Sequence, residues 1–465
     1  MQKWNMIFER SYFRLFFIFV VFLNTLSLRF WGIERNPLYP IVFIWALLII
    51  GHDFWYASWR RAYFGPLLVY GVTLLLATLA NTAYSTLDSY LIAVLQLIIF
   101  FLVFLNPPNR SLLSIRQEMR LVIPWVSLLT FVASSISLLM FFLNISLTCH
   151  GMTIGLVGER LFGIYFNCNP AAFLACISMV LSIWAFRQRF MFRYFYVLNS
   201  VVQLLYIILT GCRSVLLILA FYSICLLYVK VFRRYGFSHL KQVVLSVLTV
   251  VTIVFGANLV QKTLFIIPQL QGAKVEVENR FQFARLEEIM VMLREDPLGH
   301  FEEAAAIADE VSSGRIELLD DSLKIWKTAP LLGVGANNFR AVGLDVDPSS
   351  TVLQGAQVVH SHHVFLEALV TAGIVGFVSF LLFFVQSILT FWEALKKTSK
   401  TSFYAVVMLC LLIVVAEFIG SLFDYGIFYV YSLSATLAWQ FLGYVYWLND
   451  HLAEDLTCRD MEAID

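Results

Sequence analysis

The sequence predicts an all-α integral membrane protein with about twelve transmembrane helices and one long extracytoplasmic loop between the ninth and the tenth. Of its 465 residues, 60% are hydrophobic and only 14% are charged. A soluble protein of this size needs more charge on its surface, so lipid must solvate most of this chain. The 43 Phe, 20 Tyr and 11 Trp residues also suit a chain with aromatic residues near both membrane interfaces.

The predicted spans are apolar runs of bilayer length. A run of about 17–25 apolar residues is long enough to cross the hydrocarbon core as a helix. The first run is not followed by a small-residue cleavage site, which favours a retained span over a signal peptide. The runs lie near residues 12–29, 38–51, 63–80, 89–105, 121–145, 170–186, 194–210, 213–232, 241–261, 364–392, 402–422 and 427–447, and the second is short.

The basic residues of the short loops predict the orientation. One set of loops contains Arg60, Arg61, Arg110, Arg116, Arg120, Arg187, Arg189, Arg193, Lys230, Arg233, Arg234, Lys241, Lys396, Lys397 and Lys400. The alternate set contains only Arg29, Arg35, Arg160 and Arg213. Because cytoplasmic loops are enriched in Lys and Arg, we expect the first set and both termini to lie in the cytoplasm.

This orientation divides the chain into four parts. Residues 1–262 form spans one to nine, 263–360 the extracytoplasmic loop, 361–447 spans ten to twelve, and 448–465 a cytoplasmic tail. The loop carries eight basic and fifteen acidic residues, a net charge of −7, against +1 for the whole chain. An acidic outer loop is the expected counterpart of a membrane body with positive cytoplasmic loops.

Two segments of the loop have the pattern of short helices. Arg280–Arg294 shows helical charge pairing. Arg315–Lys327 carries apolar residues at helical spacing, with Ser312 or Ser313 as the expected N-cap. The apolar residues are Ile316, Leu319, Leu323 and Trp326, and the residues expected to end this helix are Pro330, Gly333 and Gly335.

Three arginines and three histidines are the candidate functional residues of the outer face. They are Arg160 in GERLFGIYFNCNPAA, Arg213 in TGCRSVLL, Arg315 in SSGRIELLDD, and His360, His362 and His363 in HSHHVFLEALV. A single interfacial arginine more often extends to lipid headgroups than binds a substrate. Together, however, guanidinium groups beside a histidine provide a site for a diphosphate next to a general base.

Such a site needs neither a nucleotide nor a metal if the donor is already activated on a lipid diphosphate. A metal site is disfavoured because His362 and His363 are adjacent, and adjacent side chains of a helix point apart. His360 is expected to lie in a more mobile part of the loop. Cys149 and Cys168 share an outer loop, where they form either a disulfide or two free thiols.

Four stretches of the chain, in this order, resemble the O-antigen ligase and O-antigen polymerase superfamily. They are Arg160–Pro170, Thr210–Leu217, Ser313–Phe339 and Ser361–Gly376. Members of that superfamily tend to share an R-x-x-G-x-F-x-N-x-N segment, an S-R hairpin, an S-G-R…W…P-L-L-G-V-G loop and an H-N-x-x-L…G-x-x-G helix. This chain has Cys212 in place of the hairpin serine and His363 in place of the asparagine.

The resemblance implies a GT-C-like membrane fold and transfer of a glycan from an undecaprenyl-diphosphate carrier to an acceptor sugar hydroxyl, with inversion and without a metal or cofactor. Arg160 and Arg213 would bind the diphosphate, and Arg315 would bind phosphate or brace the loop. His362 would be the base, with His363 and Glu367 orienting it. The implied partners are the lipid-linked donor, an acceptor glycan or glycolipid, and the bilayer of the inner or plasma membrane, with no nucleic acid.

Three alternatives remain open. A ligase transfers the glycan to a lipid-linked core sugar, whereas a polymerase of the same superfamily extends a chain of repeat units. A polysaccharide or lipid-linked oligosaccharide exporter would bury ionisable residues along a path at mid-bilayer, but Glu417 and Asp424 lie towards the outer end of the eleventh span. A structural scaffold for envelope assembly would explain neither the arginines nor the histidines.

Overall fold

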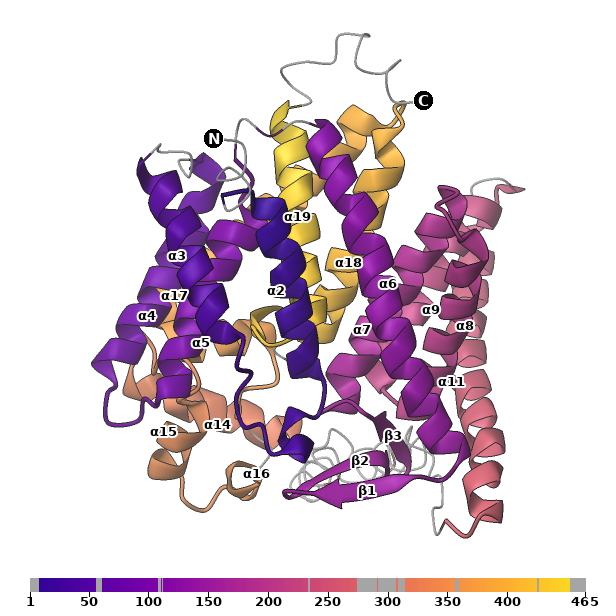
Figure 1. Ribbon diagram of the computed structural model, residues 1–465, viewed down its shortest axis with the longest axis horizontal. Coiled ribbons are helices and arrows are strands. Elements are labelled where there is room, and N and C mark those ends of the chain that lie inside the picture. The colour runs from indigo at the N-terminus through magenta and orange to yellow at the C-terminus, as the bar shows by residue number, and fades with distance from the viewer. Residues whose placement is uncertain are drawn as a thin grey trace.

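Long helices packed side by side form the body of the protein, and a small sheet lies at one end of them (Figure 1). The computed structural model describes residues 8–55, 61–107, 110, 112–232, 235–273, 291, 307, 314–355, 359–424 and 426–451. Arg280–Arg294, predicted to be helical, lies outside them except for Val291.

A helix lies at each of the twelve predicted spans. The helices are α2 (Arg10–Thr25), α3 (Tyr39–Trp55), α4 (Gly65–Ala80), α5 (Leu87–Ile98) continuing as the π-helix η3 (Ile99–Phe104), α6 (Leu112–Phe142), α7 (Cys168–Arg187), α8 (Arg193–Thr210), α9 (Arg213–Leu227) continuing as the π-helix η4 (Tyr228–Phe232), α11 (His239–Leu270), α17 (Val364–Thr398), α18 (Phe403–Ser421) and α19 (Leu433–His451). Helix α11 extends to Leu270 and therefore includes the first eight residues of the expected loop, 263–270.

Eight of these helices are long and apolar enough to cross a membrane, and α3 and α4 are shorter apolar helices. The chain is therefore an α-helical integral membrane protein, as its composition predicts. The number of twelve spans, and the side of the membrane on which each loop lies, stay predictions.

Helix α19 lies at the centre of the bundle and is buried from Leu433 to Leu448. Its Gly443 allows close packing, because a Cβ atom at this position would lie 2.0 Å from the carbonyl oxygen of Phe104 in η3. The same helix carries Trp439 and Trp447, which are among the largest fully buried side chains. Aromatic residues, which were expected near both membrane interfaces, therefore also fill the interior of the bundle.

The loop between α6 and α7 contains a three-stranded antiparallel sheet, which the sequence analysis did not predict. Strands β1 (Ser146–Cys149), β2 (Met152–Val157) and β3 (Arg160–Gly163) are ordered β1-β2-β3. His150 and Gly151 connect the first two strands, and both have positive φ, as two-residue hairpin turns require. The cysteines of this loop, Cys149 and Cys168, are free thiols.

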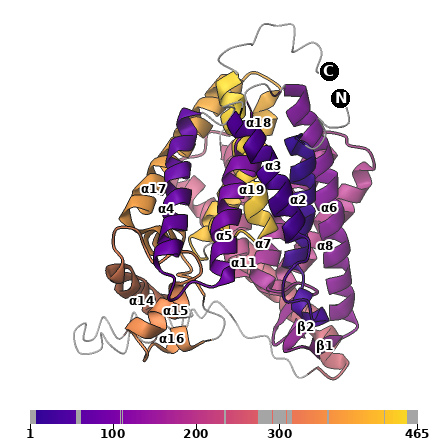
Figure 2. The same ribbon diagram turned by 60° about the vertical axis from the view of Figure 1, so that its left-hand side comes forward.

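The described part of the long loop forms α14 (Arg315–Thr328), α15 (Phe339–Val346), the short α16 (Thr351–Gln354) and the turns between them. Figures 1 and 2 place these helices at the same end of the bundle as the sheet. The turn after α14 docks on α17, since Val334 and Gly335 donate backbone hydrogen bonds to Val370 and Thr371 at 2.9 and 3.0 Å. A Cβ atom at Gly333 would lie 2.5 Å from the backbone of α17.

Helix α14 confirms the predicted helix of the loop but corrects two of its details. Its N-cap is Gly314, not Ser312 or Ser313, and no side chain caps it. The apolar residues Ile316, Leu319 and Leu323 are exposed, while α14 packs through Leu318 and Ile325, which are buried, on the opposite side. Spacing identified an apolar face, but tertiary packing used another one.

Candidate functional site

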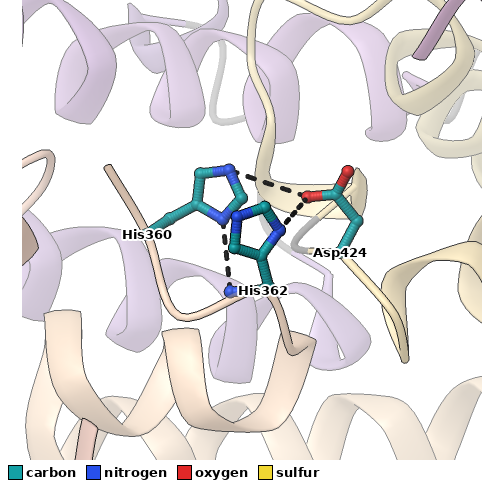
Figure 3. A group of neighbouring side chains, drawn as sticks. All are labelled: His360, His362 and Asp424. Atoms are coloured by element: carbon teal, nitrogen blue, oxygen red, sulfur yellow. Dashed lines mark hydrogen bonds and ion pairs between the residues drawn. The ribbon is translucent and has the colours of Figure 1, made fainter. Parts of the chain in front are cut away.

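A histidine pair and an aspartate meet where the long loop enters α17. His362 Nδ1 lies 3.5 Å from Asp424 Oδ1, and His360 Nε2 lies 3.6 Å from the same oxygen. Figure 3 shows both imidazole rings directed at this carboxylate, which comes from the turn after α18. We call these three residues the His–Asp site.

His360 is part of this site rather than of a mobile loop, as had been expected. Its side chain is buried, and its ring centroid lies 4.1 Å from that of His362. The turn between them is tight because His362 has φ of 51°. A left-handed conformation at a residue other than glycine costs free energy and is common at functional sites.

A hydrogen bond indicates the tautomer of His360, and the contact with Asp424 favours one for His362. The backbone N–H of His362 donates to Nδ1 of His360 at 3.2 Å, so neutral His360 carries its proton on Nε2, facing Asp424. Burial, helped by His362 and opposed by Asp424, lowers the pKa of His360 well below its ordinary value. An Nδ1–H of His362 that faces the same carboxylate leaves its Nε2 as the nitrogen able to accept a proton.

The three residues also have a spacing that could hold a metal ion, since one ligand atom of each lies within 4.8 Å of the others. The argument from adjacent histidines does not exclude this, because His362 precedes the helix and its neighbour in space is His360. However, a metal on Nε2 of His360 would require the proton on Nδ1, where the N–H of His362 already points. The donor set therefore fits hydrogen bonding better than metal coordination.

Glu367 has a different contact from the one expected. Its Oε2 accepts hydrogen bonds from the backbone N–H and the hydroxyl of Ser361, both at 2.9 Å. His363 is the N-cap of α17, and its Nδ1 has no hydrogen-bond partner among the described residues. Glu367 thus fixes the turn that carries His360 and His362, and Asp424 is the residue that contacts the imidazoles.

Arg160 and Arg315 are held by separate hydrogen bonds to other elements. Arg160 Nε donates to the carbonyl oxygen of Thr210 at 2.8 Å, and its Nη2 donates to Asn169. This contact joins the start of β3 to the hairpin in which Arg213 begins α9. Arg315 Nη2 donates to the carbonyl oxygen of Phe423 at 2.9 Å, one residue before Asp424.

The thiol of Cys212, the residue before Arg213, is affected by the charges of both Arg160 and Asp424. Burial is the largest effect on this thiol and raises its pKa, the Arg160 charge opposes that shift, and the Asp424 charge adds to it. Asn169, which accepts a hydrogen bond from Arg160, precedes Pro170, and Pro170 lines the same pocket as Asp424. The fold brings residues from four predicted motifs to one place, although more than 250 positions separate Arg160 from Asp424.

Two pockets flank the contact between His360 and Asp424. The larger, with about 480 Å³ of empty space, includes His360, Glu367, Thr371, Gln96 and Asn337 in its lining. The smaller, about 270 Å³, includes Asp424, Glu417, Ser432, Ser434 and Pro170. Tyr429 lines both pockets.

The sequence analysis missed Asp424 as a site residue, and it missed Gln96 entirely. Asp424 had been noted only for its depth, because nothing in the order of the chain connects the end of α18 to the start of α17. The available signal was that Asp424 is an ionisable residue at the outer end of a span, and such residues mark functional sites by default.

The geometry can be compared with known families. Residues 198–381 match the family model of O-antigen ligase. The matched part includes Arg213, Arg315, His362 and Glu367, whereas Arg160 and Asp424 lie outside it. No curated protein matches the chain significantly. The resemblance of this membrane protein to the O-antigen ligase and O-antigen polymerase superfamily is thus confirmed through residues 198–381.

Proposed function

We propose that the protein transfers a glycan from an undecaprenyl-diphosphate carrier to the hydroxyl of an acceptor sugar at the extracytoplasmic face of the membrane, as a ligase. The observation that carries this proposal is the His–Asp site, in which Asp424 faces Nδ1 of His362 next to two pockets. An oriented imidazole that keeps one nitrogen free is what a general base for a sugar hydroxyl requires.

In the proposed reaction, Nε2 of His362 accepts the proton of the acceptor hydroxyl while its oxygen attacks the anomeric carbon. The bond between that carbon and the diphosphate oxygen breaks, and the carrier leaves as undecaprenyl diphosphate. Attack from the face opposite to the leaving group inverts the configuration. Asp424 acts as a positioning residue that holds the imidazole in the required tautomer and stabilises the imidazolium.

Arg160 and Arg213 would neutralise the leaving diphosphate, for which the planar guanidinium offers paired donors. Arg315 would brace the loop through Phe423, because its bond to that carbonyl fixes the backbone beside Asp424. His363 and Glu367 would support the turn. This mechanism needs no metal ion.

A polymerase of the same superfamily is the alternative, since the same chemistry would extend a repeat-unit chain on a second carrier. Deletion of the gene distinguishes the two through the lipid-linked glycans that accumulate. Full-length chains on the carrier would indicate a ligase, and single repeat units a polymerase. Normal levels of both would contradict glycan transfer altogether.

A further inference from the structure

The larger pocket contains a buried polar group that no other residue uses. Gln96 has 1% of its surface exposed, lines this pocket, and its Nε2 has no hydrogen-bond partner among the described residues. An amide donor left unpaired in the interior is unfavourable, because it has lost its hydrogen bonds to water without replacing them. Such a group in a pocket wall points to a ligand that accepts its hydrogen bond.

The local backbone supports this reading. Helix α5 changes to π-helical geometry at Ile99, and the carbonyl oxygen of Gln96 accepts the N–H of that residue. Single π-helical turns within a helix are frequent at functional sites because they redirect side chains. Gln96 therefore lies where the helix departs from regular geometry.

The other lining groups define what the pocket would accept. Glu367 and Thr371 are oxygen-bearing groups, and the stacked rings of Tyr70 and Phe428, 5.0 Å apart, supply apolar surface. His360 is the basic side chain of the described lining, and burial lowers its pKa well below the ordinary value, which disfavours its charged form. The described lining thus contains the carboxyl group of Glu367 but no arginine or lysine that would pair with an anionic ligand.

We propose that this pocket binds the acceptor as a neutral, hydroxyl-bearing sugar, with Gln96 Nε2 donating a hydrogen bond to one of its oxygens. The donor diphosphate would then approach from the opposite side of the His360–Asp424 contact. Arg160 lies on that side, because it bonds Asn169, the neighbour of Pro170 in the smaller pocket. This assignment rests on the proposed function, because it names one substrate of the same site.

Binding can be tested without transfer. Neutral methyl hexosides and the matching methyl uronosides serve as probes, and saturation-transfer NMR on the purified full-length protein reports their binding. We expect the hexosides to bind and the uronosides not to bind. Gln96→Met, which keeps the size but removes the donor, should weaken hexoside binding about three- to tenfold, the range of one neutral hydrogen bond.

Two further variants control the result. Gln96→Glu keeps the shape and replaces the N–H donor with a carboxylate oxygen, so it should weaken binding at least as much, and it remains informative if Gln96→Met does not fold. Gln203→Met removes another fully buried amide, which bonds Ser134 and Asn199 instead of a pocket, and should leave hexoside binding unchanged.

Equal binding of uronosides and hexosides, or unchanged binding by both Gln96 variants, would overturn the inference. Its failure is separate from that of the proposed function. If His362→Ala transfers glycan normally while the Gln96 variants lose hexoside binding, the base assignment fails and the sugar pocket stands. If the hexosides do not bind although His362→Ala is inactive, the sugar pocket alone is wrong.

Discussion

The two ends of the helix bundle differ in how completely their charged and polar side chains are paired. At the end where α2 begins, Arg10, Arg14 and Arg110 pair with Asp53 and Glu118, and we call these five residues the terminal-side network. At the other end is the His–Asp site. Its contacts to Asp424 are 3.5 and 3.6 Å long, and it lies between two pockets.

The terminal-side network is nearly saturated with hydrogen bonds. Arg14 donates to Glu118, Asn106 and the carbonyl oxygens of Leu102 and Leu105 at the end of η3. The carboxylate of Glu118 also accepts hydrogen bonds from Ser11, Gln440 and Tyr444. None of the five network residues leaves a buried polar atom without a partner in the described part of the chain, although their neighbour Gln440 leaves its Oε1 unpaired. On the pocket side, Gln96 Nε2, Glu417 Oε2 and His363 Nδ1 lack partners among the described residues.

This difference suggests a division of roles: the paired ions at one end stabilise the fold, and the open polar groups at the other end are free to bind a substrate. Buried ions are tolerated in a membrane protein when every hydrogen-bonding position is filled from within, and removing one partner is then costly. Positions left open beside a pocket are available to a substrate. The substitutions below should therefore affect folding at one end and transfer at the other.

The largest effect is expected for His362→Ala. Loss of a general base typically lowers turnover by about 10²–10⁴-fold. Asp424→Asn should lower it less, because the imidazole remains but loses its orienting carboxylate. Both variants should retain the wild-type protein level and melting temperature, and the check is transfer of lipid-linked glycan in detergent. Normal transfer by both variants would mean that the His–Asp site is not catalytic.

The largest effect on stability is expected for Glu118→Gln. The variant leaves two buried guanidinium groups without their carboxylate, and breaking a buried ion pair costs about 3–5 kcal/mol. Thermal unfolding in detergent measures this loss. The same change at Glu393, an exposed residue paired with Lys397, is the control and should have little effect. If Glu118→Gln and Glu393→Gln are equally stable, the terminal-side network does not stabilise the fold as proposed.

Replacement of Arg213 by lysine is expected to lose most of the transfer activity while the protein inserts normally. An ammonium group cannot reproduce the paired donors of a guanidinium on a diphosphate. The same result is expected for Arg160→Lys, which also loses the geometry of its bonds to Thr210 and Asn169. Arg187→Lys at an exposed position is the control. Wild-type turnover of Arg213→Lys would favour a simple headgroup contact.

A smaller, pH-dependent effect is expected from His360. Its pKa is lowered in the folded protein, so between that pKa and the ordinary value of about 6.5 the unfolded chain binds a proton that the folded protein does not. Stability should therefore fall as the pH drops below about 6.5, and His360→Gln should reduce this fall. Melting curves between about pH 5 and 7.5 test it. An identical pH dependence in the variant would show that His360 is not the group responsible.

The smallest effect is expected at Lys324 on α14. Its ammonium group pairs with Asp320 and Asp347, each at 2.8 Å, but the side chain is 40% exposed. The hydrogen bond from Lys324 is the largest cause that lowers the pKa of Asp347 to about 2. This contribution to stability is present above the unfolded pKa of about 3.9 and is lost only in strong acid. Because the pair is partly exposed, water screens it and its contribution is small even at neutral pH. Lys324→Gln should therefore melt close to the wild type at neutral pH, and a clear loss would contradict this.

The sequence by itself determined the helical membrane body. Apolar runs of bilayer length can satisfy their backbone groups in lipid only as helices, so composition and run length were sufficient to place a helix at each predicted span. The same reasoning identified α14, and four motifs in order gave the resemblance to the O-antigen ligase and polymerase superfamily, which the match over residues 198–381 supports. Local signals failed for the β-sheet, whose turn at His150 and Gly151 depends on two positive φ angles.

Only the tertiary structure decided which polar residues meet. Asp424 contacts His362 because α17 and α18 pack side by side, and no periodicity within either helix encodes that contact. Likewise, Gln96 faces a pocket because α4, α5 and α17 leave space between them. The helix that a side chain belongs to follows from local sequence, whereas the partner it faces depends on the packing of segments far apart in the chain.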